Sequence, residues 1–257
     1  MSPVAFSVVG MTTWQPEPLL DFPEPERIPA WTRLVGVFDL ETTGVDVETD
    51  RIVTAHVGVI DGSGAVVHAR DWLADPGVDI PEGATAVHGI TTEHARSEGR
   101  AASEVVADVV DALRGLFAAG IPVVAYNACY DFSLLRHEAM RHGIPALKNP
   151  APIIDPLVLD KAHDRYRRGK RTLEAVAAHY AVPLEGAHDA CADAVAAGRV
   201  AQALAERFGA QLPPTAAELH TRQIGWARAQ AASLTEYFIK VGRLDPDDAL
   251  DGSWPVR

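Results

Sequence analysis

Residues 34–44, LVGVFDLETTG, are the stretch that decides the fold. An apolar run of this kind is typical of a strand that is buried in a sheet. Asp39 and Glu41 are two residues apart, so in a strand both carboxylates lie on one face. Two buried carboxylates side by side are unfavourable unless a cation compensates them, which indicates a metal site. The alternative is a strand end whose acids face water.

Two more strands are predicted directly after this stretch. IVTAHVGVI at 52–60 and VVHARDWL at 66–73 are apolar or partly alternating, and the sequence between them at 61–64 is Asp-Gly-Ser-Gly. Glycine supplies the positive φ that a hairpin turn needs. The sequence therefore predicts an antiparallel meander at the start of the fold.

Beyond the meander the pattern changes to helices and strands. A helix is predicted over 103–116, and IPVVAYN at 121–127 predicts a buried strand that joins the sheet in parallel. Further helices are expected over 131–142, 172–180, 189–208 and 215–240. We expect an α/β fold with a central mixed five-stranded sheet, the antiparallel meander followed by parallel strands, flanked by helices.

The 257 residues are enough for one α/β core with appendages. We expect an irregular Pro-rich leader over 1–30, the main domain over 31–210, and a helical extension with a polar tail over 211–257. No basic stretch followed by an apolar run marks a secretory signal, and no apolar segment is long enough to span a bilayer. The expectation is a cytoplasmic protein without a membrane partner, in which Cys129 and Cys191 are free thiols.

A formal net charge of -12 argues against a protein that coats nucleic acid non-specifically. It leaves open an enzyme that keeps its positive charge in one local patch. The basic residues cluster between Lys161 and Arg171, around Tyr166. Within this cluster the candidates for phosphate contacts are Arg167, Arg168, Lys170 and Arg171. A solvated loop explains the same charges equally well.

Two further acidic motifs lie where helices are predicted to begin. Asp131 ends the segment NACYD at 127–131, at the edge of the sheet where α/β folds usually bind ligands. It is either a helix N-cap or a ligand. In HDACAD at 188–193, a helix capped by Asp189 places Asp193 one turn in and leaves His188 on the preceding loop. Taken alone, His188 is better explained as a structural or surface histidine than as a catalytic one.

The order D-x-E, N-x-x-x-D, H-x-x-x-x-D resembles the motifs of the DEDDh, or DnaQ-like, 3′–5′ exonuclease family, which includes the proofreading ε subunit of bacterial DNA polymerase III. The similarity runs from about residue 34 to 208, through FDLETTG, VHGIT at 87–91, NACYDFSLL and HDACADA. The resemblance implies a ribonuclease H-like fold. It also implies hydrolysis of terminal phosphodiester bonds with release of nucleoside 5′-monophosphates.

The resemblance assigns a role to each motif residue. Asp39, Glu41, Asp131 and Asp193 are the implied ligands of two divalent cations, and His188 is the implied general base. Oxygen ligands favour Mg²⁺ or Mn²⁺, whereas zinc favours cysteine and histidine. The residues implied to line the pocket for the terminal nucleotide are Thr42, Thr43, His88, Ile90, Asn127 and Tyr130. Ile90 and Tyr130 are also explained as core residues, and Tyr130 stands where relatives often carry phenylalanine.

The motifs leave the substrate and the partners open. We expect single-stranded or 3′-ended nucleic acid, DNA before RNA. An oligoribonuclease or RNase T-like enzyme is the alternative, because such enzymes resemble the same motif set and the choice of sugar depends on the shape of the pocket. The alternative of another class is a non-catalytic scaffold with this fold, against which the complete set of acids and His188 counts. A homodimer is possible, since residues 219–238 carry an apolar helical stripe that packs on the core or on a second subunit. Nothing in the sequence supports association with a polymerase.

Overall fold

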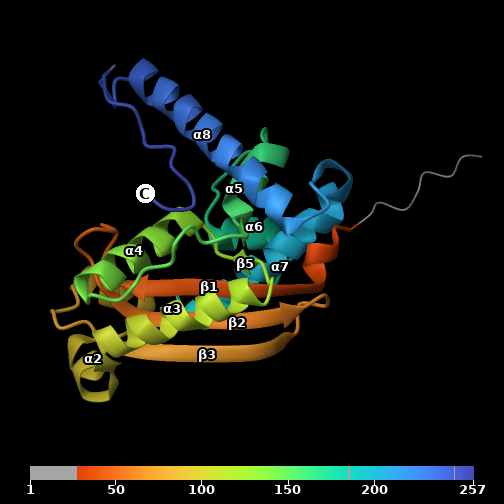
Figure 1. Ribbon diagram of the computed structural model, residues 1–257. Coiled ribbons are helices and arrows are strands. Elements are labelled where there is room, and N and C mark those ends of the chain that lie inside the picture. The colour runs from red at the N-terminus through yellow and green to blue at the C-terminus, as the bar shows by residue number, and fades with distance from the viewer. Residues whose placement is uncertain (1–27, 185, 246) are drawn as a thin grey trace, which may run out of the picture.

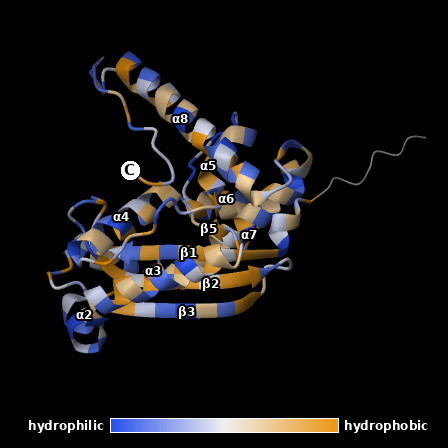
Figure 2. Ribbon diagram, in the orientation of Figure 1, coloured by the Kyte–Doolittle hydropathy of each residue, from blue (hydrophilic) through white to orange (hydrophobic). Residues whose placement is uncertain are grey.

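In the computed structural model, residues 28–184, 186–245 and 247–257 are described, so most of the predicted leader lies outside the described residues. These residues form a mixed sheet with helices packed against it (Figure 1). Apolar residues are most concentrated in the central strand β2, whereas β3 also carries hydrophilic residues (Figure 2). Within these ranges no helix combines the length and apolarity that a membrane crossing requires.

The predicted meander is confirmed. Strands β1 (Leu34–Thr42), β2 (Ile52–Asp61) and β3 (Val66–Asp75) pair antiparallel in sequence order. Strands β5 (Val123–Val124) and β6 (Ile153–Ile154) extend the sheet in parallel from β1, and β4 (Arg100–Ala101) lies parallel to β3. The described sheet therefore has six strands in the order β4-β3-β2-β1-β5-β6, which corrects the predicted five.

Helices account for most of the other described residues. They are α1 (Glu82–His88), α2 (Thr92–Glu98), α3 (Ala102–Ala118), α4 (Ala128–Arg141), α5 (Pro156–His163), α6 (Leu173–His179), α7 (Ala190–Phe208) and α8 (Ala216–Lys240), with 3₁₀ turns η1 (Ala30–Arg33) and η2 (Gly209–Gln211). The four helices predicted after residue 130 begin within three residues of their predicted starts. Helices α1, α2 and α5 were not predicted.

The two faces of the sheet bury separate apolar clusters. Phe38 and Leu40 pack in the cluster that contains residues of α3 and α4, whereas Val35 and Val37 pack with α7. Since side chains alternate along a strand, the odd-numbered positions of β1 face α7. This alternation places both acids of β1 on the α7 face, as the two-residue spacing predicts.

The C-terminal segment returns to the body of the protein. Helix α8 contacts β6 and α5 near its start and then extends away from the sheet, and the chain runs back to end beside α4 (Figure 1). Trp254 is buried, and its indole N–H donates to Asp155 Oδ2 at 3.3 Å. The backbone N–H of Arg257 donates to Ser133 Oγ on α4 at 2.9 Å. The end of the predicted polar tail is thus part of the packed structure.

Candidate active site

Four carboxylates from three elements meet at one end of β1. Asp39 and Glu41 lie on the strand, Asp131 lies in the first turn of α4, and Asp193 lies in the first turn of α7. The other three carboxylates lie close enough to Asp39 that their charges, in addition to burial, raise its pKa. The structure therefore brings the four predicted acids together.

Burial is the largest cause of the shifts in this acidic cluster, which we define as Asp39, Glu41, Asp131 and Asp193. The pKa values of Asp39 and Asp131 are raised well above the usual range by burial and by neighbouring carboxylates. The pKa of Glu41 is raised from 4.5 to about 7, and that of Asp193 is raised as well. Among the described residues no Arg or Lys forms an ion pair with these groups.

The donor atoms of the acidic cluster suit a hard divalent cation. Asp193 Oδ1 is buried and has no hydrogen-bond partner within the described ranges. Glu41, His188 and Asp193 offer ligand atoms that all lie within 4.8 Å of one another. Carboxylate oxygens without a counter-charge are the ligands that Mg²⁺ and Mn²⁺ prefer. The residues present thus fit the metal that the sequence motifs imply.

The helix cap predicted for α7 is confirmed and places His188 on the preceding loop. Asp189 is the N-cap, and its carboxylate accepts the backbone N–H of Ala192 at 3.0 Å. His188 has a left-handed backbone with φ 67°, and its own N–H donates to Asp193 Oδ2 at 3.2 Å. Its side chain is 48% exposed, with Nε2 3.4 Å from Glu174 Oε1 on α6. Glu174 is a neighbour that no sequence motif indicated.

Asp155 is a second residue that the motifs missed. This buried carboxylate accepts the backbone N–H groups of Asn127 and Ala128, both at 3.0 Å, and that of Leu157 at 2.9 Å. The first two bonds fix the start of α4, one turn before Asp131. Asn127, with φ 60°, is the N-cap position of α4, so Asp131 is not the cap. The Asp-Pro pair at 155–156 is a helix-start signal that could have indicated Asp155.

The predicted pocket residues on β1 and α4 form a tight turn with internal hydrogen bonds. The hydroxyls of Thr42 and Tyr130 both donate to Gly44 O at 2.6 Å. Thr43 Oγ1 donates to Asp50 Oδ1 at 2.8 Å. These hydroxyls therefore shape the turn beside Glu41, and Tyr130 presents its ring from the first turn of α4.

The other predicted pocket residues lie on α1 and at the start of α4. His88 ends α1, its Nδ1 accepts the N–H of Ile90 at 3.1 Å, and the backbone of Thr42 is close enough to affect its pKa. Burial lowers that pKa, which favours the neutral ring. Ile90 is partly buried against a small cluster that includes Val53, and Asn127 is exposed.

The basic cluster divides into two kinds of residue. Arg167 donates to the buried carboxylate of Asp160 at 2.8 Å, and Arg171 donates to the same carboxylate. These two guanidinium groups hold the loop after α5 to the body of the protein. Arg168 and Lys170 are exposed, so they are the members of the predicted set that solvent reaches.

The mixed sheet and the four converging carboxylates define the class of protein, an α/β protein with a ribonuclease H-like fold. Residues 37–201 match the family model of the RNase T type, described as exonuclease. The chain belongs to this family, the DnaQ-like 3′–5′ exonucleases.

Two curated relatives illustrate the similarity in sequence. The chain is 32% identical over 169 residues to the PolC-type DNA polymerase III of Lacticaseibacillus paracasei, covering 65% of this chain and 11% of the relative. It is 33% identical over 165 residues to a DNA polymerase III subunit epsilon-like protein of Rhodobacter capsulatus, covering 62% of this chain and 22% of the relative. The chain thus spans only a small part of these relatives.

Solved structures confirm the fold class. Escherichia coli exonuclease I in complex with a dT13 oligonucleotide has a TM-score of 0.54 and 19% identity, covering 66% of this chain and 40% of that one. Exonuclease I of Methylocaldum szegediense has a TM-score of 0.58 and 21% identity, covering 79% and 45%. At these identities the likeness concerns the ribonuclease H-like fold alone.

Proposed function

We propose that this chain is a 3′-to-5′ exonuclease that hydrolyses terminal phosphodiester bonds of DNA with two divalent cations and releases nucleoside 5′-monophosphates. The acidic cluster carries this proposal. Four carboxylates meet at the end of β1, their pKa values are raised, and no basic partner lies among the described residues. Such a cluster is costly to fold unless cations bind it.

Asp39, Glu41, Asp131 and Asp193 would hold two Mg²⁺ or Mn²⁺ ions, which when bound lower the pKa of water and stabilise charge on the attacking and leaving oxygens. The carboxylates themselves must be ionised to bind cations. Because their pKa values are raised, part of the cluster carries protons near neutral pH, and cation binding is expected to release them. Affinity for cations should therefore increase with pH.

His188 would act as the general base. A neutral imidazole accepts a proton near physiological pH, and the half-exposed loop position lets the ring reach a water at the cluster. The backbone bond from His188 to Asp193 ties this loop to the cluster. Glu174, near Nε2, would help to hold the ring on this side of the site.

The terminal nucleotide would bind beside the acids. Thr42, Thr43, His88, Ile90, Asn127 and Tyr130 are the proposed contacts. Tyr130 and Ile90 can pack against a base without reading its edges, which suits an enzyme that accepts any sequence. Arg168 and Lys170 are the exposed groups that could meet phosphates further along the strand.

The similar proteins favour DNA as the proposed substrate, because those with a named substrate act on DNA or hold a DNA oligonucleotide. The curated relatives are DNA polymerase III proteins, and the solved exonuclease I structures hold dT13 and dA16 oligonucleotides. Each of these facts concerns another protein, and this chain covers only part of each. An oligoribonuclease or RNase T-like enzyme is the alternative that a direct comparison of substrates would reveal.

The test is degradation of 5′-labelled single-stranded DNA, duplex DNA and RNA in parallel, with Mg²⁺, with Mn²⁺ and with EDTA. We expect single-nucleotide shortening of single-stranded DNA that requires a cation and leaves circular single strands intact. The Glu41→Gln variant should be inactive, whereas Glu48→Gln, an exposed acid beyond the end of β1, should retain activity. Full activity in EDTA would overturn the metal assignment, faster degradation of RNA would favour the alternative, and binding without cleavage would indicate a scaffold.

A further inference from the structure

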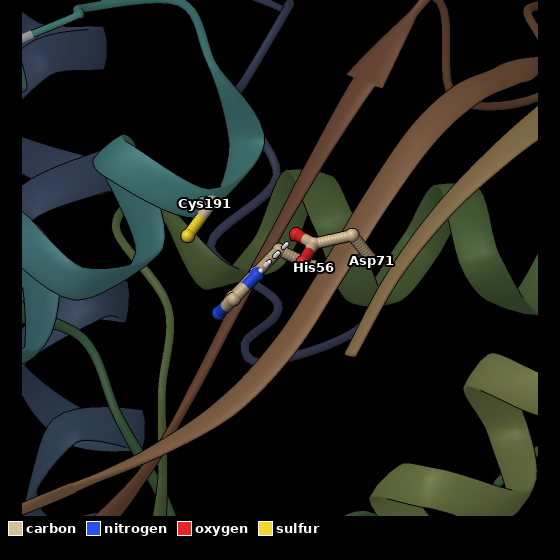
Figure 3. A group of neighbouring side chains, drawn as sticks. All are labelled: His56, Asp71 and Cys191. Atoms are coloured by element: carbon tan, nitrogen blue, oxygen red, sulfur yellow. Dashed lines mark hydrogen bonds and ion pairs between the residues drawn. The ribbon is translucent and has the colours of Figure 1, made fainter. Parts of the chain in front are cut away.

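A second group of potential ligands lies on the α7 face of the sheet, beside the acidic cluster. It consists of His56 on β2, Asp71 on β3 and Cys191 in the first turn of α7 (Figure 3). His56 Nδ1 lies 2.7 Å from Asp71 Oδ1. One donor atom from each of the three residues lies within 4.8 Å of the other two.

The histidine is in an unusual position for a sheet. His56 is completely buried, and its Nε2 has no hydrogen-bond partner in the described part of the chain. Strand register places His56 opposite Asp39 on one side and opposite Asp71 on the other. The unpartnered Nε2 lies on the side of the ring away from Asp71, so the case for a ligand rests on the donor atoms of His56, Asp71 and Cys191, which converge within 4.8 Å.

We propose that His56, Asp71 and Cys191 bind a thiophilic divalent cation of the zinc type at a site separate from the acidic cluster. Cysteine, histidine and aspartate are ligands of zinc, and three protein ligands leave one tetrahedral position for water. Mg²⁺ prefers oxygen ligands and disfavours a thiolate. The two sites therefore select different ions, and this proposal does not depend on the proposed nuclease activity.

Nδ1 is the ring nitrogen that faces the proposed ion. Nε2, on the other side of the ring, packs closely on Gly58. A Cβ atom added to Gly58 would lie only 2.6 Å from Nε2, so there is no room for an ion on that side. The ion would replace the proton between Nδ1 and Asp71, and it would bind Cys191 as a thiolate. The ring proton moves from Nδ1 to Nε2, so that the ligand is a neutral imidazole, the thiol proton leaves to solvent, and no redox step is involved.

The ligands can close around an ion without a change in the sheet. Ligand atoms of a tetrahedral zinc ion are roughly 3–4 Å apart, given bond lengths of ~2.0–2.3 Å. The side chain of Asp71 is 65% exposed and Cys191 is partly exposed, so both can rotate and an ion can enter from solvent. The bound ion would connect β2 and β3 to the first turn of α7. That turn also carries Asp193.

Cobalt titration of the full chain in excess Mg²⁺ tests the site, because a thiolate bound to Co²⁺ gives a charge-transfer band that carboxylates do not give. Zinc added afterwards should abolish the band by displacement. The chain has two cysteines, so Cys191→Ser and Cys129→Ser are a matched pair. Asp71→Asn tests the second ligand, whose side chain is 65% exposed.

We expect the band in the wild type and in Cys129→Ser, and no band in Cys191→Ser. Asp71→Asn should weaken cobalt binding at least ~10-fold, since even outer-shell partners of a metal contribute that much. Circular dichroism of each variant shows whether it is folded. Absence of the band in the folded wild type, its persistence in Cys191→Ser, or unchanged affinity in Asp71→Asn would each overturn the proposal.

Discussion

Replacing Glu41 with glutamine should make the metal-free protein more stable at high pH. In the folded state the pKa of Glu41 is raised from 4.5 to about 7, so the folded protein holds this proton more tightly than the unfolded chain. Ionisation therefore costs stability as the pH rises between these two values, and the full cost remains above the higher one. Glutamine has the shape of the protonated acid and does not ionise.

The size of the effect follows from the same shift. At ~1.4 kcal/mol per pH unit, moving the pKa from 4.5 to about 7 sets an upper bound of about 3 kcal/mol. Glu41 is partly exposed, and solvent screening reduces this to ~1–2 kcal/mol. For a domain of this size each kcal/mol moves Tm by ~2–4 °C, so a gain of about 2–8 °C is expected.

Thermal unfolding of the EDTA-treated protein between about pH 4 and about pH 8 measures this effect. The gain in Tm should be full at the high end and vanish at the low end. Added Mg²⁺ should make the wild type more stable than Glu41→Gln. A ligand at ~100 times its Kd stabilises the wild type by ~2.7 kcal/mol, and it stabilises the variant by less because one ligand group is missing. Glu48→Gln is the matched control, because it removes the same charge from an exposed turn.

A gain that does not depend on pH would refute this reasoning. So would an equal gain in Glu48→Gln, which would trace the effect to net charge instead of to the acidic cluster.

Three further predictions concern single residues. Asp39→Asn should abolish cation-dependent cleavage of a 5′-labelled oligonucleotide while circular dichroism stays native, and cleavage at the wild-type rate would contradict its role. His188→Ala should lose ~10²- to 10⁴-fold in single-turnover rate with unchanged oligonucleotide affinity, and weaker Mn²⁺ binding would make it a ligand instead. Trp254→Ala should cost ~3–5 kcal/mol in urea unfolding, because it removes a buried indole and a donor to Asp155; an unchanged midpoint would show that the C-terminal segment is dispensable.

The long strands and helices could be predicted from sequence because their hydrophobic patterns repeat over enough residues to be recognised. The first three strands have nine or ten residues each, enough for burial and turn signals to identify them. Strands β4 and β6 have two residues each, which is too short for any period. Helix α1 has no buried residue, so it has no apolar stripe that the sequence could display. Such short elements depend on neighbours that only the fold supplies.

The same distinction applies to the site. The four acids and His188 lie in short contiguous motifs, and each motif coincides with the end of a strand or the start of a helix. Asp155 accepts hydrogen bonds from the start of α4 and from the indole of Trp254, which is 99 residues away in sequence. Arg167 and Arg171 could be counted as charges, but their binding to Asp160 could not be foreseen, because the burial of Asp160 is a tertiary fact. Composition therefore identified basic residues without showing which of them remain accessible.

The acidic cluster depends on how closely α7 approaches the sheet, and Gly198 sets that approach. A Cβ at this position would lie 2.5 Å from Val37 Cγ1 and 2.7 Å from Ile60 Cδ1, so a side chain here would force these neighbours or α7 to move. Asp193 is five residues earlier on the same helix, or ~7.5 Å along its axis. Since helices are stiff over this length, a helix held away from the sheet at Gly198 would carry Asp193 away from Asp39. The packing of the core thus determines the distance between carboxylates that electrostatic repulsion alone would drive apart.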